Sequence, residues 1–580
     1  MPTLPPRPSV EYLKKQAKRL LKSAKAQDAD ALDQIGPFFG DPAKISLQQA
    51  QLVIARNHGF SSWTKLLRYI QSGAGDEETT EQRANRFLDL ACIHYAPDPS
   101  DRSAAEFEQA AALLTAHPDI AHYNLHTAAA AGDAEAVRNM IAHAPDTIEQ
   151  KGGPFHWTPL MYAAYARVPG HSTLEAGKIL LDAGADPNAH FMSYGTYRFA
   201  ALTGVFGDGE GGLVRQPPHP DMVPFARALL DAGANPNDSQ GAYNRCFSPD
   251  NTHLELMLEY GLKDSDPSDW WLTEPDRNPN DHRTMHFQLI IALRWGFADR
   301  ARLLIDHGVD INTPDNNYYP TYTVGYTPYQ VAQMRGMPEI AELIKSRGGR
   351  ADPLDAYRTW QAACMRGDLT AARAMADTHM GVNPTEDQEL FREAAGNGNL
   401  AAVQTMIALG FELSPRGTRT PLHAAAYKGH LDVMHALIDA GADTAMRDPD
   451  YDTPPFVHAL HNFQGEAAEV LLEQPMDIFA AAAMGRTARV EQLLSRDANL
   501  VHARFRSVRT GPQDTHARDW ATPLLYAALN GRTDTARMLL DHGADASISA
   551  PDGKSIAAFA EEAGQEDICS LLKDGQKQSG

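Results

Sequence analysis

The sequence has few cysteines and no long apolar run. Its 580 residues include four cysteines, at Cys92, Cys246, Cys364 and Cys569. Four scattered cysteines predict neither a disulfide framework nor a cysteine-based zinc site. No segment approaches the roughly 18 uninterrupted apolar residues of a membrane helix, and residues 1–8 have no apolar core like that of a signal peptide. We therefore expect a cytoplasmic protein.

Standard catalytic signatures are also missing. The chain has no His-Glu-x-x-His, Cys-x-x-Cys or Gly-x-Ser-x-Gly sequence. Gly553-Lys554-Ser555 is similar to the end of a phosphate-binding loop, but such a loop requires glycine where the chain has Ile548. His122 and His126 have a spacing that suits a metal, but His126 shares the register of His423, where a ring can hydrogen-bond between loops. We expect no cofactor and no metal.

Outside the first 70 residues, negative charge outnumbers positive charge. The chain has 52 Lys and Arg against 74 Asp and Glu, a net charge of −22. Residues 1–70 hold 11 Lys and Arg against 5 Asp and Glu, so the remainder carries −28. An acidic body of this size argues against nucleic acid or an anionic membrane as a partner. It permits a basic peptide, a basic protein face or a small molecule, although acidic surface also simply keeps proteins dispersed.

What the chain has in abundance is one repeated phrase. Residues 420–429 read Thr-Pro-Leu-His-Ala-Ala-Ala-Tyr-Lys-Gly, and residues 437–443 read Leu-Ile-Asp-Ala-Gly-Ala-Asp. Partial copies recur along the chain, and the step from Thr420 to Thr453 is 33 residues. Thr420 can cap a helix whose first position is Pro421, and Gly429 can end that helix in the left-handed conformation. A period of this length indicates a solenoid, and solenoids usually bind rather than catalyse.

The phrase resembles the ankyrin repeat family, whose units are helix–turn–helix pairs joined by projecting β-hairpin fingers. Cap, proline, alanines, glycines and spacing all agree with that family. The stretch from Ala50 to Trp63 is similar to a short N-terminal module of some bacterial ankyrin proteins. The fold class that this resemblance implies is an all-α ankyrin-repeat solenoid preceded by a small helical module.

Four regions follow from the composition. We predict an N-terminal helical module at 1–72, an acidic linker at 73–82, irregular ankyrin repeats with insertions at 83–348, and more regular repeats with a C-terminal cap at 349–580. In the third region the step from Gly184 to Gly233 is 49 residues instead of about 33. The extra residues form a glycine-rich stretch at 207–220. Because insertions in repeats map to loops, the irregular region is where function is expected.

Aromatic residues in the predicted fingers are the binding candidates. Tyr and Trp bury much area at low entropic cost and dominate binding hot spots, although some of these rings must instead pack finger against finger. The candidates come from adjoining repeats: Trp157, Tyr194, Tyr197, Tyr318, Tyr319, Tyr322 and Tyr326. With them, the sequence favours a scaffold that binds a protein or peptide through a concave face.

An enzyme or small-molecule binder is the alternative. Its pocket would lie among residues 190–330, with Glu210 and His219 as acid–base partners and with Tyr243 and Arg245 from the next repeat reaching the same groove. A structural interpretation of the same residues is a long turn in which Arg245 pairs with Glu210 or Asp208. The missing catalytic motifs favour binding over catalysis.

Overall fold

The computed structural model divides into two compact units, residues 1–86 and 87–580. The structure describes residues 10–25, 31–32, 35, 45, 47–57, 63, 67, 79–95, 104–193, 197–210, 212–265, 283–315, 323–462, 464–474, 476–505, 519–551, 553–562, 565, 567–569 and 571–572. None of the helices in these ranges has the length and hydropathy needed to span a bilayer.

The first unit contains a small helical core. Helix α1 (Val10–Lys25) packs against α3 (Leu47–Asn57). Leu13, Ala17 and Leu20 are buried on one side of α1, because residues three and four apart share a helix face. The lysines Lys14, Lys18 and Lys22 are exposed. The boundary between the units falls within α5 (Thr80–Ala91).

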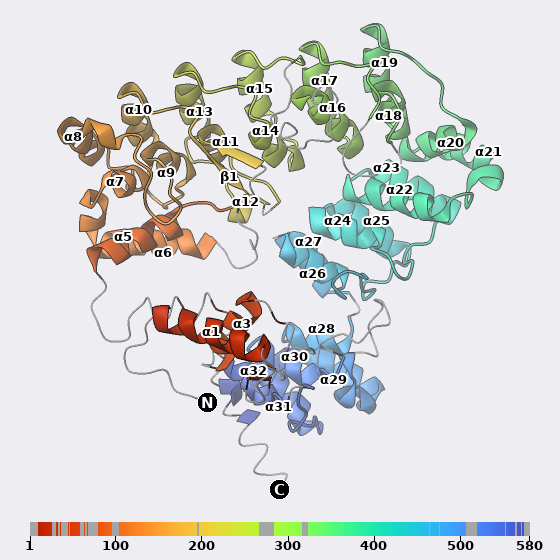
Figure 1. The fold of residues 1–580 in the computed structure, drawn as a ribbon. Helices are drawn as coiled ribbons and strands as arrows, with labels where there is room; N and C mark the ends of the chain where they lie inside the picture. Colours follow the sequence, from red (N-terminus) through yellow and green to blue (C-terminus); the bar gives the residue numbers. More distant parts are fainter. Residues whose placement is uncertain are drawn as a thin grey trace. The chain divides into compact units, whose positions relative to one another are not determined.

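The second unit consists of consecutive helix pairs (Figure 1). The first helices are α7 (Leu125–Ala131), α9 (Pro159–Tyr165), α11 (Ala201–Phe206), α14 (Ser239–Asn244), α16 (Thr284–Trp295), α18 (Pro328–Met334), α20 (Ala356–Met365), α22 (Pro384–Gly396), α24 (Pro421–Lys428), α26 (Pro455–His461), α28 (Ile478–Ala483), α30 (Pro523–Leu529) and α32 (Ile556–Glu562). The second helices are α8 (Ala134–His143), α10 (Leu174–Asp182), α13 (Met222–Asp231), α15 (Thr252–Glu259), α17 (Ala298–Asp306), α19 (Pro338–Ser346), α21 (Leu369–His379), α23 (Leu400–Leu409), α25 (Leu431–Asp439), α27 (Gly465–Leu472), α29 (Thr487–Arg496) and α31 (Thr533–Asp541).

Short elements accompany these pairs. Helix α6 (Ala104–Ala116) precedes them, and the 3-10 turns are η3 (Pro118–His122), η4 (Pro145–Thr147), η5 (Arg245–Phe247) and η7 (Ala498–His502). One finger contains a two-stranded antiparallel hairpin of β1 (His190–Ser193) and β2 (Tyr197–Ala200), with Phe191 opposite Phe199. The extra residues of the long repeat lie between α11 and α13 and include α12 (Gly212–Arg215).

The pair α24–α25 shows how the repeated phrase forms a unit. The Thr420 hydroxyl accepts a hydrogen bond from the His423 backbone N–H, and Pro421 occupies the first turn of α24. Gly429 ends that helix with φ +76°, a conformation that favours glycine. In α25, Val433, Met434 and Leu437 are buried at helical spacing. Local capping and burial therefore both specify the helix pair.

First helices pack against one another in chain order, α7 on α9, α9 on α11 and so on through α24 on α26. The buried apolar residues nevertheless form separate clusters. One ends at Ile344, the next runs from Trp360 to Leu471, and a third begins at Met476. The first separation lies at residues 347–355, between α19 and α20, which we call the junction.

Candidate functional site

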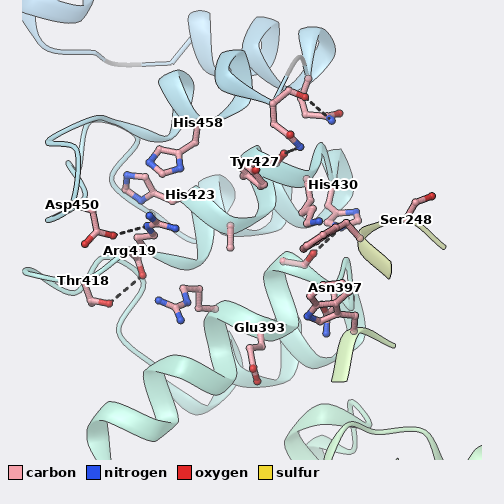
Figure 2. A pocket seen from close by; sticks show the side chains of 18 of the residues that line it. Ser248, Glu393, Asn397, Thr418, Arg419, His423, Tyr427, His430, Asp450 and His458 are labelled. Carbon is pink, nitrogen blue, oxygen red and sulfur yellow. Dashed lines mark hydrogen bonds and ion pairs between the residues drawn. The ribbon is translucent and has the colours of Figure 1, made fainter. Parts of the chain in front are cut away.

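A cavity of about 990 Å³ lies in the second unit (Figure 2). Repeats from both sides of the junction line it. Before the junction the lining comes from α12, η5 and α16, and after it from α22, α24, α26 and the fingers that precede α24 and α26. It is large enough for a short peptide segment or a small ligand.

The wall before the junction is apolar and aromatic. The Phe247 and Trp295 rings lie 5.5 Å apart between centroids, and Phe297 contacts Trp295 edge-on at 6.0 Å. Leu213, on α12 within the insertion, is 54% exposed and lines the same cavity. Exposed apolar groups gathered at a hollow mark binding surfaces more often than scattered ones do.

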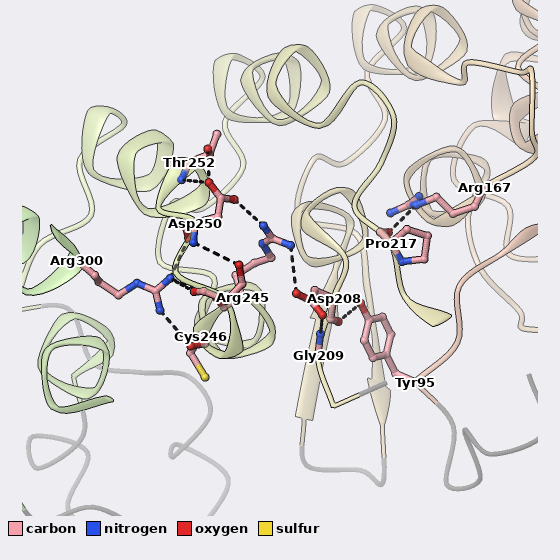
Figure 3. A network of polar contacts seen from close by, with 11 residues as sticks. Tyr95, Arg167, Asp208, Gly209, Pro217, Arg245, Cys246, Asp250, Thr252 and Arg300 are labelled. Carbon is pink, nitrogen blue, oxygen red and sulfur yellow. Dashed lines mark hydrogen bonds and ion pairs between the residues drawn. The ribbon is translucent and has the colours of Figure 1, made fainter. Parts of the chain in front are cut away.

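A buried arginine holds η5, and with it Phe247, in place. Arg300 donates from its guanidinium to the carbonyl oxygens of Cys246 at 3.2 Å and Ser248 at 2.6 Å, and to the Asn251 side chain at 2.9 Å (Figure 3). Burial lowers the pKa of Arg300 to about 10. Because one guanidinium donates to several carbonyls of this turn, it fixes the backbone that presents Phe247 to the cavity.

The wall after the junction is polar and cationic. Asn397 and Lys428 lie at the ends of α22 and α24, and Arg419 lies in the finger before α24. A carboxylate within the wall, that of Asp450, lies 2.9 Å from the Arg419 Nε atom (Figure 2). The other lining carboxylate, that of Glu393, accepts hydrogen bonds from both terminal nitrogens of Arg335. Both lining carboxylates are therefore already neutralised by arginine.

Lys428 is the lining cation that lacks such a partner. Its ammonium lies 5.8 Å from the centroid of the Trp295 ring and 5.9 Å from that of Tyr427, within the range of cation–π attraction. Among the described residues no carboxylate pairs with it. The residue is open to solvent through the cavity mouth, yet protein crowds its ammonium. This burial lowers the pKa of Lys428, against the opposing charges of Cys246 and Asp208.

Tyr427 adds a second polar group to this wall. Within the described part of the chain its hydroxyl makes no hydrogen bond. Burial raises the pKa of that hydroxyl, and the charges of Arg419 and Arg215 oppose the rise. Arg215, at the end of α12, therefore lies close enough to the cavity to act on its lining. It has no ion-pair partner in the described ranges either.

Besides the approach of Lys428 to Trp295, two hydrogen-bonded contacts join the walls across the junction. Asn397 donates from Nδ2 to the Arg294 carbonyl oxygen at 3.0 Å. Arg335, at the end of α18 and nearly fully buried, pairs with Glu393 of α22. These contacts bring the end of α22 to the ends of α16 and α18, although α20 lies between them in the chain.

Three residues near the cavity have metal-ligand chemistry. Ligand atoms of His423, Asp448 and His458 lie within 4.8 Å of one another. However, His423 Nδ1 accepts from the Thr420 backbone N–H at 3.2 Å, and its Nε2 lies 3.0 Å from the Thr453 carbonyl oxygen. Asp448 accepts from His458 at 3.1 Å and from several backbone N–H groups of its own turn. These contacts join neighbouring fingers and occupy the atoms that a metal would need.

The sequence analysis predicted a polar cluster of Glu210, His219, Tyr243 and Arg245, and the structure brings some of these residues together. The Tyr243 hydroxyl donates to Glu210 at 2.8 Å. Arg245, which is buried, pairs with Asp208 at 3.3 Å and with Asp250 at 2.5 Å (Figure 3). Asp208 has a φ of +58°, in the left-handed region, and its backbone carbonyl accepts from the Tyr95 hydroxyl at 2.9 Å. The pairing of Arg245 with Asp208 is the structural interpretation that the sequence allowed.

His219 makes other contacts. Its Nε2 lies 2.8 Å from the Thr173 hydroxyl, which donates to the Ala163 carbonyl, and its Nδ1 accepts from the Asp221 backbone N–H at 3.0 Å. Burial, with a smaller effect of the Arg167 charge, lowers the pKa of His219 to about 3. Both ring nitrogens are thus used within the protein. No contact joins His219 to Glu210, Tyr243 or Arg245 among the described residues.

The aromatic finger candidates differ in their surroundings. Trp157 is 6% exposed and stacks on Phe191 at 4.9 Å in a cluster with Tyr162 and Tyr165. Tyr197 is half-buried in β2, and Tyr326 is half-buried, with its hydroxyl accepting from Arg358 Nε at 3.2 Å. Tyr194, Tyr318, Tyr319 and Tyr322 lie outside the described residues.

Sequence reasoning did not select the residues that line the cavity. Lys428 precedes the glycine that ends its helix, and Trp295 holds the same position before Gly296. Asn397 likewise stands just before Gly398. The repeat pattern identifies the position before the glycine at the end of a helix. This position would have indicated Trp295, Asn397 and Lys428. What it could not show is that these repeats, far apart in the chain, face one cavity.

Comparison with known proteins identifies the repeats. The family described as Ankyrin repeats (3 copies) matches residues 359–448, 391–481 and 478–579, and the family described as Ankyrin repeat matches residues 155–190. No curated protein matches the chain. The chain thus contains ankyrin repeats and folds as an all-α ankyrin solenoid. The wall with Asn397 and Lys428 lies inside the matched residues, whereas the wall with Leu213, Phe247 and Trp295 lies outside them.

Proposed function

We propose that this protein is a scaffold that binds a segment of a partner protein in the cavity formed across the junction. Ankyrin repeats generally mediate protein–protein interaction, so the repeats supply the class of function. The observation that carries the proposal is the cavity itself. A solenoid that served only as a spacer would not need an exposed leucine and an aromatic cluster facing unpaired donors across a hollow.

The basic preference inferred from net charge is not part of this proposal. Both carboxylates of the lining are paired with arginine, so they offer a basic segment little attraction. The aromatic finger residues outside the cavity, Tyr197 and Tyr326, could extend the contact surface. Their role remains a prediction.

Catalysis is not proposed for the predicted polar cluster. Glu210 accepts a hydrogen bond from Tyr243, Arg245 pairs with Asp208 and Asp250, and His219 contacts Thr173. A general base needs a free acceptor within hydrogen-bond reach of a substrate. The cluster instead supports the loop that carries α12 and Leu213.

The test uses peptides selected against the protein from a random-sequence display library. The affinity of each selected peptide is then measured for the Leu213→Ser variant. Leu213 is exposed, so the substitution should leave the fold intact, while the lost apolar contact should weaken binding about tenfold. Val382→Ser is the matched control, because Val382 is 64% exposed and does not line the cavity. Equal affinities of all three proteins, or a library that yields no peptide, would overturn the proposal.

A further inference from the structure

The cavity carries more positive than negative charge, in a protein with a net charge of −22. Its lining holds Arg392, Arg419 and Lys428 against Glu393 and Asp450. Arg392 pairs with Glu389, and Glu393 pairs with Arg335. Glu389 and Arg335 do not line the cavity, and their opposite charges cancel. Among the described residues neither Lys428 nor the nearby Arg215 forms an ion pair, although the charges of Asp208 and Glu210 also act on this wall. Local charge and overall charge therefore have opposite signs.

The Lys428 ammonium stands in a site suited to an anion. Trp295 and Tyr427 flank it, with ring centroids 5.8 Å and 5.9 Å from the ammonium nitrogen. Protein surroundings lower the pKa of Lys428, so part of the hydration of its ammonium is already lost in the free protein. An incoming carboxylate would restore the lost solvation with a charge-assisted hydrogen bond. The Tyr427 hydroxyl, which makes no hydrogen bond within the described residues, offers a further donor on the same wall, and the Arg215 guanidinium acts on it from α12.

An aromatic or aliphatic group would fit beside that anion. Phe247 and Trp295 form a continuous aromatic surface next to Lys428, and Leu213 extends it. Aromatic rings pack well against such a surface in offset or edge-on geometry. The cavity thus places an apolar subsite next to an anion subsite. Two adjacent side chains of one bound peptide can reach both.

We infer that the cavity recognises an acidic peptide segment, in which an Asp or Glu carboxylate pairs with Lys428 while an adjacent aromatic or leucine side chain packs on Phe247 and Trp295. The inference rests on the proposed function and deepens it, since it names the chemistry of the bound segment. A peptide is favoured over a small acid because the cavity continues into the finger residues Thr418, Arg419 and Asp450. These finger atoms offer contacts to a chain that extends beyond the two subsites.

The experiment compares matched peptides on matched proteins. Library-selected peptides are synthesised in two forms, one with Asp and Glu and one with Asn and Gln at the same positions. Both forms are titrated against the full chain, against Lys428→Gln, and against Lys345→Gln as control. Lys345 is an exposed lysine that pairs only with Glu342 of its own helix. Intrinsic tryptophan fluorescence reports occupancy next to Trp295.

We expect the acidic form to bind the wild-type protein and Lys345→Gln about tenfold more tightly than the amide form. Lys428→Gln should bind both forms equally, and Lys428→Arg should restore the preference. If the selected peptides lack acidic residues, or if their preference survives in Lys428→Gln, the inference fails. The proposed function would still stand provided that Leu213→Ser weakens binding. Failure of the Leu213→Ser test would remove both.

Two other occupants give distinct results. A small aromatic acid as the natural ligand would be revealed if benzoate alone saturated the Trp295 signal at micromolar concentration and displaced every peptide. A second copy of the chain would be revealed by concentration-dependent sedimentation that Leu213→Ser abolishes. Either result would overturn the assignment of an acidic peptide.

Discussion

Asn397 donates a hydrogen bond from its side chain to the backbone carbonyl of Arg294, at 3.0 Å. Asn462 makes the corresponding bond to the Tyr427 carbonyl at 2.6 Å, from one repeat to the preceding one. Arg294 belongs to α16 and Asn397 caps the end of α22, and the first helices α18 and α20 lie between them in the chain. A contact that elsewhere joins neighbouring repeats is thus made across the junction. It brings the aromatic wall to face the cationic wall.

The pair Arg335–Glu393 should stabilise the same arrangement. Arg335 is nearly fully buried, so Glu393→Gln removes a carboxylate charge that pairs with a buried guanidinium. We expect a loss of about 2–3 kcal/mol in the free energy of unfolding, together with weaker binding of any peptide that occupies the cavity. Urea denaturation and peptide titration measure the two effects. Glu342→Gln, in an exposed pair with Lys345, should cost less than about 0.5 kcal/mol, and similar costs for both variants would contradict the prediction.

Trp157 provides a test of packing against binding. Its ring is buried among Phe155, Tyr165 and Phe191. Trp157→Ala should therefore destabilise the protein by about 3–5 kcal/mol, measured by chemical denaturation. Tyr123→Ala serves as the control, because Tyr123 is 42% exposed. If Trp157→Ala instead folded with unchanged stability and lost only affinity for a partner, the ring would have to act at a binding surface.

Arg167 should be essential to the irregular repeats. It is buried, has its pKa lowered to about 10 by that burial, and donates to the carbonyls of Ala164, Ala166, Gly204 and Pro217. Arg167→Met leaves these acceptors without their donor, at a cost of about 1 kcal/mol or more each. We expect a loss of more than about 3 kcal/mol by thermal or urea denaturation. Arg227→Met, in an exposed pair with Glu259, should stay within about 1 kcal/mol of wild type.

Acid should destabilise the protein through buried neutral histidines. Burial lowers the pKa of His219 and of His423 to about 3 in the folded state, whereas unfolded histidine titrates near 6.5. Between these values the unfolded chain binds more protons, so stability falls as the pH decreases from about 6.5 toward 3. Each histidine contributes a slope of up to about 1.4 kcal/mol per pH unit.

The variant His219→Gln isolates one of these contributions. It removes a titrating group while keeping a polar atom near Thr173, so its stability should decline less steeply over the same pH range. Denaturation midpoints between pH 4 and 7 measure the slopes for both proteins. Parallel profiles for wild type and variant would show that His219 is not held neutral by the fold.

Much of the fold was predictable because its determinants are local. Thr420 as a cap, Pro421 in the first turn and Gly429 at the helix end act within a few residues of chain, and each does so in the structure. The 49-residue step also located the insertion correctly, between α11 and α13. The site was harder to predict. Trp295 and Lys428 lie at the same position of their repeats. Because the pattern is the same in every repeat, it does not indicate which two repeats are in contact.

Sequence alone therefore determined the repeat and the ends of its clearest helix, and it led to the expectation of a binding protein. These depend on capping, on backbone conformation and on apolar spacing, all of which are short-range. The tertiary structure decided where the polar and aromatic residues meet. It directed Glu210 and Arg245 into internal contacts, buried Trp157 in the core, and brought Lys428 to Trp295. The physical reason is that these contacts depend on the path of the chain over many repeats. A long-range contact such as Arg335 with Glu393 produces no periodic pattern in the sequence.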